Sequence, residues 1–193
     1  NKHKICIKLI KNNSDENKPD FSLPNEEIVN ILDNAIKGKR ILVIANTIFQ
    51  TQDIYKKIMQ ITQIESKYNS LKNKIWLLHS KFTIEDRKEK EEMLKREFNN
   101  PKDEGENEAK ILIATQVVEA SLDIDADILF TEIAPMDSLV QRMGRVLRRY
   151  GPLTNFNEIP KPEENNVFIW LFANGIQSGM NYVYDNDIVL LTF

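Results

Sequence analysis

Short apolar runs alternate with amphipathic segments along most of this chain, and the two kinds of segment predict different elements. The apolar runs are rich in β-branched residues and end at polar or turn-forming residues, which is typical of strands buried on both faces. Strands are expected at residues 4–10, 41–46, 75–80, 111–114, 128–134 and 167–172. Helices are expected at residues 24–37, 47–64 and 83–98 and from residue 137 onward. This alternation predicts an α/β fold, a three-layer arrangement with a parallel sheet between helices.

Capping residues support the boundaries of these helices. Pro24 suits the first turn of a helix whose apolar stripe ends before Gly38, a residue that favours a helix C-terminus. Thr83 and Asp86 have the spacing of a capping box at the start of a strongly charged helix. Two polar stretches, residues 99–109 and 151–166, are expected to be surface connections.

The helix expected after residue 137 has two contrasting faces. Asp137 or Ser138 is the expected N-cap. One face would carry the apolar residues Leu139, Met143, Val146 and Leu147. The opposite face would carry Gln141, Arg145, Arg148 and Arg149. A row of guanidiniums is usually a solvated face, but it also matches the geometry of phosphate oxygens.

Gly144 favours the second interpretation of the arginine row. A glycine in a helix interior costs about 1 kcal/mol relative to alanine, and Gly144 lies beside Arg145. We therefore expect another molecule to approach the backbone closely at this position.

Composition places limits on the kind of protein. The chain has 193 residues, 41% of them hydrophobic, and a net charge of −3, which argues against coating nucleic acid by bulk charge. Its single cysteine, Cys6, excludes an intramolecular disulfide. No apolar run approaches the ~20 residues of a membrane span, so a soluble, cytoplasmic protein without a membrane partner is expected. Because the chain starts at Asn1 and ends on an apolar run, we expect it to be excised from a longer protein.

Polar residues follow three of the expected strands directly. They are Asn46 and Thr47, His79 and Ser80, and Thr115 and Gln116. In parallel sheets the carboxyl ends of the strands share one edge, where ligands collect and where helix N-termini add backbone donors. Each of these residues alone would be an ordinary helix cap. Their repetition at one edge favours contacts with phosphodiester oxygens.

The parts that hold a nucleotide and its metal are missing from this sequence. No GxxxxGK[ST] phosphate loop and no DExD or DExH strand end occurs. Two histidines cannot form a multi-histidine metal site. Asp123, Asp125 and Asp127 lack the glycine and glutamate of a calcium loop, and we expect them to alternate into a buried strand. The chain alone therefore cannot be a complete ATPase.

Two segments resemble motifs V and VI of superfamily 2 helicases: ATQVVEASLDID at residues 114–125 and QRMGRVLRR at residues 141–149. Together with LHSKF at residues 78–82 and Asp86-Arg87, they are similar to the helicase of type I CRISPR systems. The resemblance covers residues 40–151, the motif-bearing core of a second RecA-like domain. An entry strand and helix at residues 1–39, and a connector with terminal strands at residues 152–193, complete that domain.

The resemblance implies roles for individual residues. In this family ATP and Mg²⁺ lie between two RecA-like domains, and the first domain, which is outside this chain, holds the metal. Arg145 and Arg148 would be arginine fingers that stabilise the γ-phosphate, with Gln141 supporting them. Asp123 would contact the ribose or couple to the fingers, and Gly144 would adjoin the nucleotide. Nucleic acid would be contacted through Asn46, Thr47, His79, Ser80, Thr115 and Gln116, while the role of Arg142 is open.

The resemblance also implies partners. They are single-stranded DNA gripped through its phosphates, the first RecA-like domain, an HD nuclease and a guide-RNA surveillance complex. The isolated fragment would be inactive. Two alternatives remain: the same domain of another superfamily 2 translocase, which would keep the same arginines, and a non-enzymatic α/β binding module, for which changing Arg145 would have no effect.

Overall fold

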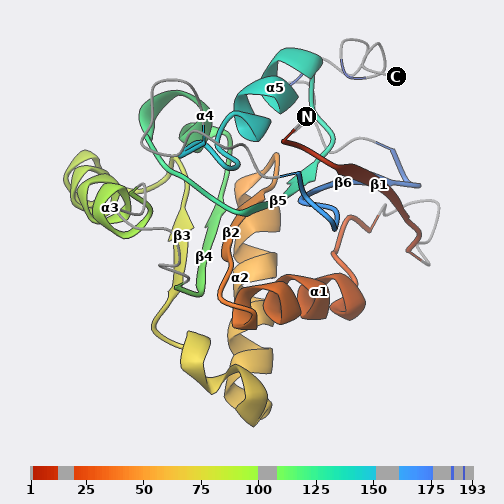
Figure 1. The fold of residues 1–193 in the computed structure, drawn as a ribbon, viewed down its shortest axis with the longest axis horizontal. Helices are drawn as coiled ribbons and strands as arrows, with labels where there is room; N and C mark the ends of the chain where they lie inside the picture. The colour runs from red at the N-terminus through yellow and green to blue at the C-terminus, as the bar shows by residue number, and fades with distance from the viewer. Residues whose placement is uncertain are drawn as a thin grey trace.

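The computed structural model describes residues 2–12, 20–99, 108–150 and 161–175, together with residues 184 and 189. Within these residues six strands form one sheet, and every neighbouring pair is parallel. The strands are β1 (Ile5–Ile10), β2 (Arg40–Ile44), β3 (Ile75–Leu78), β4 (Lys110–Ala114), β5 (Ile128–Glu132) and β6 (Val167–Phe172). Their spatial order is β1-β6-β5-β2-β4-β3 (Figure 1). The predicted parallel sheet is confirmed.

Helices cover both faces of this sheet, which gives the predicted three layers. One face packs against α1 (Asn25–Ile36), α2 (Ile48–Ile64) and the short 3₁₀ helix η1 (Ser66–Leu71). The other face packs against the end of α3 (Ile84–Glu97), α4 (Val117–Ser121) and α5 (Met136–Met143). The three-layer architecture is visible in Figure 1, where α1 and α2 lie on one side of the strands.

The central strands explain why the sheet needs both layers. Every residue of β2, β4 and β5 is buried, so the continuous apolar runs read in the sequence are packed on both faces. In β2, Ile41 and Val43 face α1 and α2, whereas Leu42 and Ile44 face α4 and α5. Two-sided burial fixes the register, because a slip of one residue would exchange the two faces.

The predicted caps of α2 and α3 are observed. Thr47 accepts a hydrogen bond from the backbone N–H of Gln50, and Thr83 accepts one from the backbone N–H of Asp86. After α1, Gly38 has a φ of 82°, a left-handed conformation that glycine adopts without strain.

The prediction of a helix through residue 149 is wrong. Helix α5 begins after Pro135, not after Asp137 or Ser138, and ends at Met143, with Gly144 as its C-cap. Val146 instead forms a parallel bridge with Ala126 ahead of β5. Both apolar residues of this stretch, Val146 and Leu147, are buried, but as part of a turn. Apolar spacing alone did not distinguish the turn from another helical turn.

Three further expectations need correction or lie outside the described residues. Asp123 to Asp127 do not form a strand, because β5 begins at Ile128. The elements α4 and η1 were not predicted from the sequence. Most of the two expected surface connections, residues 100–107 and 151–160, and most of the chain after the expected strand at residues 167–172 are outside the described residues.

Candidate functional site

The two expected arginine fingers, Arg145 and Arg148, lie on the turn that follows α5. The backbone N–H of Ala126 donates to the carbonyl of Arg145 at 2.9 Å, and the backbone N–H of Leu147 donates to the carbonyl of Ala126 at 2.8 Å. Leu147 has a φ of 52°, an uncommon conformation for a residue with a branched side chain. The turn therefore folds back beside the segment that leads into β5, and it does not form a helical face. The expected arginine row on one helix face is wrong.

Arg145, Arg148 and Asp123 nevertheless come together. A terminal nitrogen of Arg148 lies 2.9 Å from a carboxylate oxygen of Asp123. Arg145 donates to the main-chain carbonyl of Glu119 at 2.8 Å. Partial burial lowers the pKa of Arg145, and Arg148 lowers it further, whereas Asp123 raises it. Two cations and one carboxylate thus share this part of the surface.

The ion pair of Arg148 with Asp123 is open to solvent. The Arg148 side chain is 41% exposed and the Asp123 side chain 75% exposed. Such surface pairs contribute about 0–1 kcal/mol, so a phosphate could replace the carboxylate at little cost. Arg149, the fourth residue of the expected row, points elsewhere: it is buried against Asp125 and Asp127.

Gln141 and Gly144 are both exposed at the C-terminal half of α5. Gly144 has a φ of −61°, which any residue can adopt. A Cβ atom there would meet only the helix's own carbonyl oxygens within 3.4 Å: Gln141 at 3.2 Å and Val140 at 3.4 Å. The backbone conformation therefore does not require a glycine.

At the carboxyl ends of β2 and β5, Arg142 is the centre of a buried polar network. It is fully buried on α5, and its role could not be assigned from the sequence. Its guanidinium donates hydrogen bonds to side chains or carbonyls of Asn46, Glu119, Thr131, Glu132 and Tyr184, at 2.6–3.2 Å. Arg142 therefore ties α5 to α4 and to the ends of β2 and β5.

Asn46 belongs to this network. Its side chain is 2% exposed, its amide nitrogen donates to the carbonyl of Ile133 at 2.8 Å, and its amide oxygen accepts from Arg142. The backbone N–H of Asn46 donates to the carboxylate of Glu132, a fully buried group whose pKa is raised to about 7 by that burial. In this conformation Asn46 positions the β2–α2 loop and does not face solvent.

The other residues expected to contact DNA lie at the ends of neighbouring strands, as predicted. Thr47 follows β2, Thr115 and Gln116 follow β4, and His79 and Ser80 follow β3. The backbone N–H of Thr115 donates to the carbonyl of Leu78 at 3.2 Å, which links the ends of β4 and β3. Ser80 is exposed, Thr47 and Gln116 are partly exposed, and Thr115 is buried.

His79 is a buried ring. It stacks on Phe82 with ring centroids 4.3 Å apart, and its Nδ1 accepts from the backbone N–H of Lys81. Burial lowers its pKa, and the nearby Lys81 and Lys90 lower it further. Lys81, two residues after His79, is exposed and places a positive charge on this loop.

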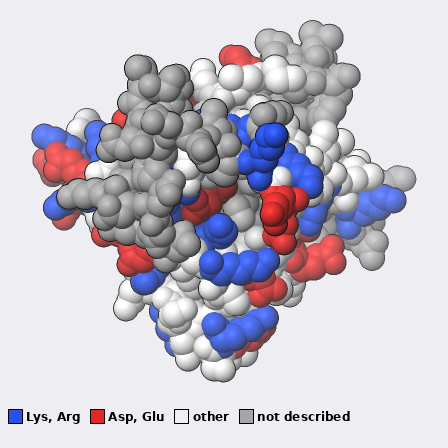
Figure 2. All heavy atoms as spheres, viewed as in Figure 1, with Lys and Arg blue, Asp and Glu red and all other residues white. Residues whose placement is uncertain are grey.

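The two groups of predicted residues are held by different segments of the chain. The expected DNA contacts lie at the carboxyl ends of β2, β3 and β4, whereas the backbone of residues 144–150, the arginine turn, pairs with Ala126 ahead of β5. The Arg145 side chain reaches back to Glu119 of α4. Figure 2 shows basic and acidic side chains interspersed on the face it draws. Local placement of cations, and not bulk charge, is what this surface offers to an anionic ligand.

Within the described residues there is no group of three or more His, Cys, Asp or Glu side chains that could hold a metal ion. In the same part of the chain, no helix is long and apolar enough to cross a membrane.

The motif-bearing part of the chain matches a known family. Residues 37–151, more than half of the chain, match the family model described as CRISPR-associated nuclease/helicase Cas3, C-terminal. The chain belongs to this family. The predicted resemblance to a CRISPR superfamily 2 helicase is thereby confirmed.

Individual Cas3 proteins show the same relationship. The CRISPR-associated endonuclease/helicase Cas3 of Escherichia coli (strain K12) is 37% identical over 113 residues, which cover 58% of this chain and 12% of the relative. The CRISPR-associated nuclease/helicase Cas3 of Streptococcus thermophilus is 31% identical over 167 residues, 83% of this chain and 16% of the relative. The chain thus spans less than a fifth of the length of these Cas3 relatives.

Solved Cas3 structures share the fold. The structure titled "Crystal structure of T. fusca Cas3-ATP" superimposes with a TM-score of 0.70 at 22% identity, over 97% of this chain and 21% of that one. A chain in "CRISPR RNA-guided surveillance complex, pre-nicking" gives a TM-score of 0.62 at 21% identity, over 96% and 21% of the two chains. The sheet and its two helix layers are therefore the Cas3 RecA-like fold.

Sequence reasoning missed the pairing of four buried residues, Arg142, Glu132, Asp125 and Arg149, and of the partly buried Glu119. A signal was present for some of them. Glu132 interrupts an apolar strand, and Asp125 and Asp127 alternate with Ile124 and Ala126. A carboxylate inside an apolar run indicates a buried, paired group, but the sequence does not show which cation pairs with it.

Proposed function

We propose that this chain is the second RecA-like domain of an ATP-dependent helicase that translocates on single-stranded DNA in CRISPR interference. The strongest support is that the chain matches this family and carries two solvent-accessible guanidiniums, those of Arg145 and Arg148, on the turn that corresponds to motif VI. A non-enzymatic binding module would not need Arg145 and Arg148 next to each other beside the solvent-exposed Arg148–Asp123 ion pair.

Arg145 and Arg148 act on the nucleotide across the cleft to the first RecA-like domain. Bound ATP supplies the phosphoryl group that is transferred to water. Arg148 leaves Asp123 for a γ-phosphate oxygen, and Arg145 keeps its bond to the carbonyl of Glu119 or exchanges it for a second oxygen. Fixed positive charge near the developing negative charge lowers the barrier, and arginine fingers contribute about 10³–10⁵ in rate.

The remaining nucleotide-facing residues support these two arginines. Asp123, released from Arg148, is free to accept from a ribose hydroxyl, and the exposed Gln141 lies on the same helix end. Gly144 leaves the surface beside Arg145 without a side chain, which gives a phosphate room to approach. The first domain holds Mg²⁺.

The loops at the carboxyl ends of β2, β3 and β4 bind the DNA backbone. Thr47, Ser80 and Gln116 contact phosphates directly, with Lys81 adding charge, whereas Asn46, His79 and Thr115 hold the loops. Because these loops contact phosphates and not bases, the affinity for single-stranded DNA should depend strongly on salt concentration and little on DNA sequence. Closing and opening of the cleft move this edge relative to the first domain, and this motion advances the strand.

The same proposal names the partners. They are a first RecA-like domain and an HD nuclease, and a guide-RNA surveillance complex that recruits them. Support comes from the printed names of the relatives, which combine nuclease and helicase, and from the surveillance-complex title of one structural neighbour. The isolated chain should not hydrolyse ATP, because the proposed site needs both domains.

The test is single-stranded-DNA-stimulated ATP hydrolysis by the full-length parent, comparing wild type with Arg145→Ala and Arg148→Ala. We expect kcat to fall about a hundredfold or more for Arg145→Ala, with circular dichroism unchanged. Arg96→Ala is the matched control, because Arg96 is exposed on α3 and donates to its own helix. Wild-type turnover in Arg145→Ala would refute the finger role and favour a binding module.

A further inference from the structure

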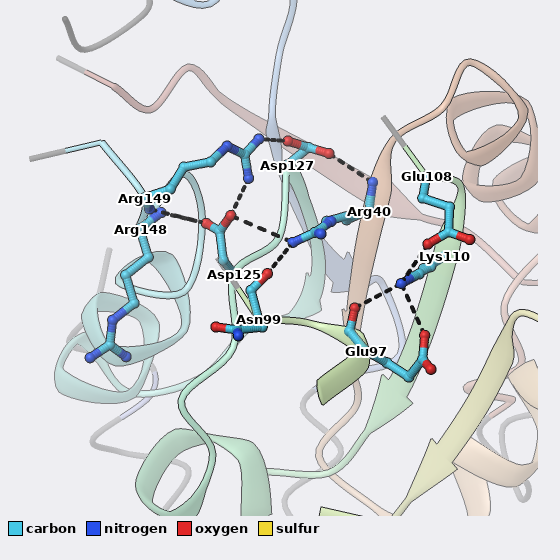
Figure 3. Close-up of polar contacts among 9 residues, drawn as sticks. All are labelled: Arg40, Glu97, Asn99, Glu108, Lys110, Asp125, Asp127, Arg148 and Arg149. Carbon is cyan, nitrogen blue, oxygen red and sulfur yellow. Dashed lines mark hydrogen bonds and ion pairs between the residues drawn. The ribbon is translucent and has the colours of Figure 1, made fainter. Parts of the chain in front are cut away.

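A buried ion cluster lies directly beneath the arginine turn (Figure 3). The guanidinium of Arg149 pairs with the carboxylates of Asp125 and Asp127, and all three residues are buried. Arg40 joins from the start of β2: its backbone N–H donates to Asp127 at 2.8 Å, and its guanidinium lies 4.0 Å from Asp125. The cluster therefore connects the turn after α5 with the amino ends of β2 and β5.

Asp125 has a second set of bonds that Asp127 lacks. Its Oδ1 accepts the backbone N–H of Arg148 at 2.7 Å and the backbone N–H of Arg149 at 3.3 Å. Its other oxygen accepts from the Arg149 side chain. One buried carboxylate thus holds both the main chain of Arg148 and the cation that follows it.

This contact matters because the turn needs support. Leu147, the residue before Arg148, has a φ of 52°, a conformation that costs roughly 1–2 kcal/mol for a residue with a Cβ atom. Such a conformation persists only when the surrounding bonds fix it. The backbone bridge at Ala126 holds the turn before Leu147, and Asp125 holds it after Leu147.

We propose that Asp125 is a positioning residue for the arginine finger Arg148, acting through its hydrogen bond to the Arg148 backbone, while the Arg149 side chain orients the Asp125 carboxylate. This inference rests on the proposed role of Arg148 at the nucleotide. Arginine catalysis depends on placement, and a misplacement of about 1 Å can cost about a hundredfold in rate. Asp125 does not touch the nucleotide. It fixes the position of the Arg148 main chain, from which the side chain extends.

The structure supplies close controls. Asp127 is equally part of the cluster and also accepts a backbone N–H, but that of Arg40 in β2. A neighbouring ion cluster in Figure 3 is formed by Lys110 with Glu97 and Glu108, at 2.9 and 2.7 Å, and has no recorded bond to the turn. Lys110 is buried like Arg149, so Lys110→Met removes a buried charge without touching the finger.

The experiment compares Asp125→Asn with Asp125→Leu in the full-length parent. Both remove the charge and keep a side chain that branches at Cγ, but only asparagine keeps an oxygen that can accept from Arg148. We expect Asp125→Leu to lower kcat of DNA-stimulated ATP hydrolysis about tenfold or more, with the KM for ATP changed less than about threefold. Asp125→Asn should recover part of that loss. Asp127→Leu and Lys110→Met should keep kcat within about threefold of wild type.

A double-mutant cycle with Arg148→Ala completes the test. If Asp125 acts through Arg148, Asp125→Leu should cause little further loss of kcat once Arg148 is alanine. Equal losses in Asp125→Leu and Asp127→Leu, or no difference between Asp125→Leu and Asp125→Asn, would overturn the positioning role. If Asp125→Leu does not fold, Asp125→Ala replaces it in the same comparison. A wild-type rate in Arg148→Ala would instead refute the proposed function of Arg148 itself.

Discussion

Buried charged residues at both ends of the sheet are held by partners far away in the sequence. Arg142 and Glu132 lie at the carboxyl ends of the strands, and Asp125 and Arg149 at the amino ends. The sequence indicates that a carboxylate within an apolar run is buried and paired. The sequence does not indicate which cation is the partner. Arg149 comes close to Asp125 only because the chain turns after α5.

Glu132 should make stability depend on pH. Its folded pKa is raised to about 7 by burial, from an ordinary value of 4.5 in the unfolded chain. Its contribution to stability is fully present below pH 4.5 and is lost as pH rises through 7, because only the unfolded state releases the proton in that window. Glu132→Gln keeps an oxygen that can accept from Asn46 and has no proton to lose.

The measurement is denaturant unfolding of wild type and Glu132→Gln between pH 4.5 and 8. The unfolding free energy of Glu132→Gln relative to wild type should rise with pH across this range. Parallel pH profiles for the two chains would show that the folded pKa is not raised. Glu163→Gln, in a residue that is exposed at the surface, is the control and should leave the profile unchanged.

At the scale of elements, the predicted strands agree closely with the observed ones, whereas α5 is shorter than predicted. Continuous apolar runs such as residues 111–114 fit only a buried strand or helix, and their length decides for a strand. Val146 and Leu147 are buried in either a helix or a turn, so periodicity could not separate the two. The bridge to Ala126, a non-local contact, determines the outcome. Gly144, predicted to lie inside the helix, is its C-cap residue.

Helix α3 depends on its cap more than the other long helices do. Only Leu94 of its fourteen residues is buried, so packing contributes little. Thr83→Ala removes the acceptor for the Asp86 backbone N–H and should destabilise the helix by about 1 kcal/mol. Hydrogen exchange of the first turn of α3 measures this effect, and Thr83→Ser, which keeps the hydroxyl, should exchange like wild type. Equal protection in Thr83→Ala would show that the cap contributes nothing.

At the scale of the whole molecule, the parallel topology was predictable and the separation of the two candidate surfaces was not. Strand ends that share an edge follow from alternating strands and helices, so the grouping of Thr47, Ser80 and Gln116 was expected. The backbone of the arginine turn reaches Ala126, ahead of β5, because α5 begins at the carboxyl end of β5 and runs back along the sheet. Its endpoint depends on tertiary pairing.

This separation predicts variants that affect one ligand only. Ser80→Ala combined with Lys81→Ala should weaken single-stranded DNA binding and reduce the salt slope by about 0.7, as expected for one lost phosphate contact. ATP affinity without DNA should stay unchanged. Lys72→Ala, an exposed lysine at the amino end of β3, is the matched control. Fluorescence anisotropy at several salt concentrations measures the slope of log affinity against log salt concentration. An unchanged slope in the double variant would exclude this edge of the sheet as the DNA-binding surface.

Strand β1 has a practical consequence for handling the chain in solution. It is an edge strand of the described sheet, and Ile5, Ile7 and Leu9 expose about half of their surface along one side. An apolar edge with unpaired backbone groups is a template for further strands. Concentrated samples of the 193-residue chain should therefore scatter light through edge-to-edge aggregation, and Ile7→Lys should suppress it. Colloidal stability of this domain is thus governed by one face of its first strand.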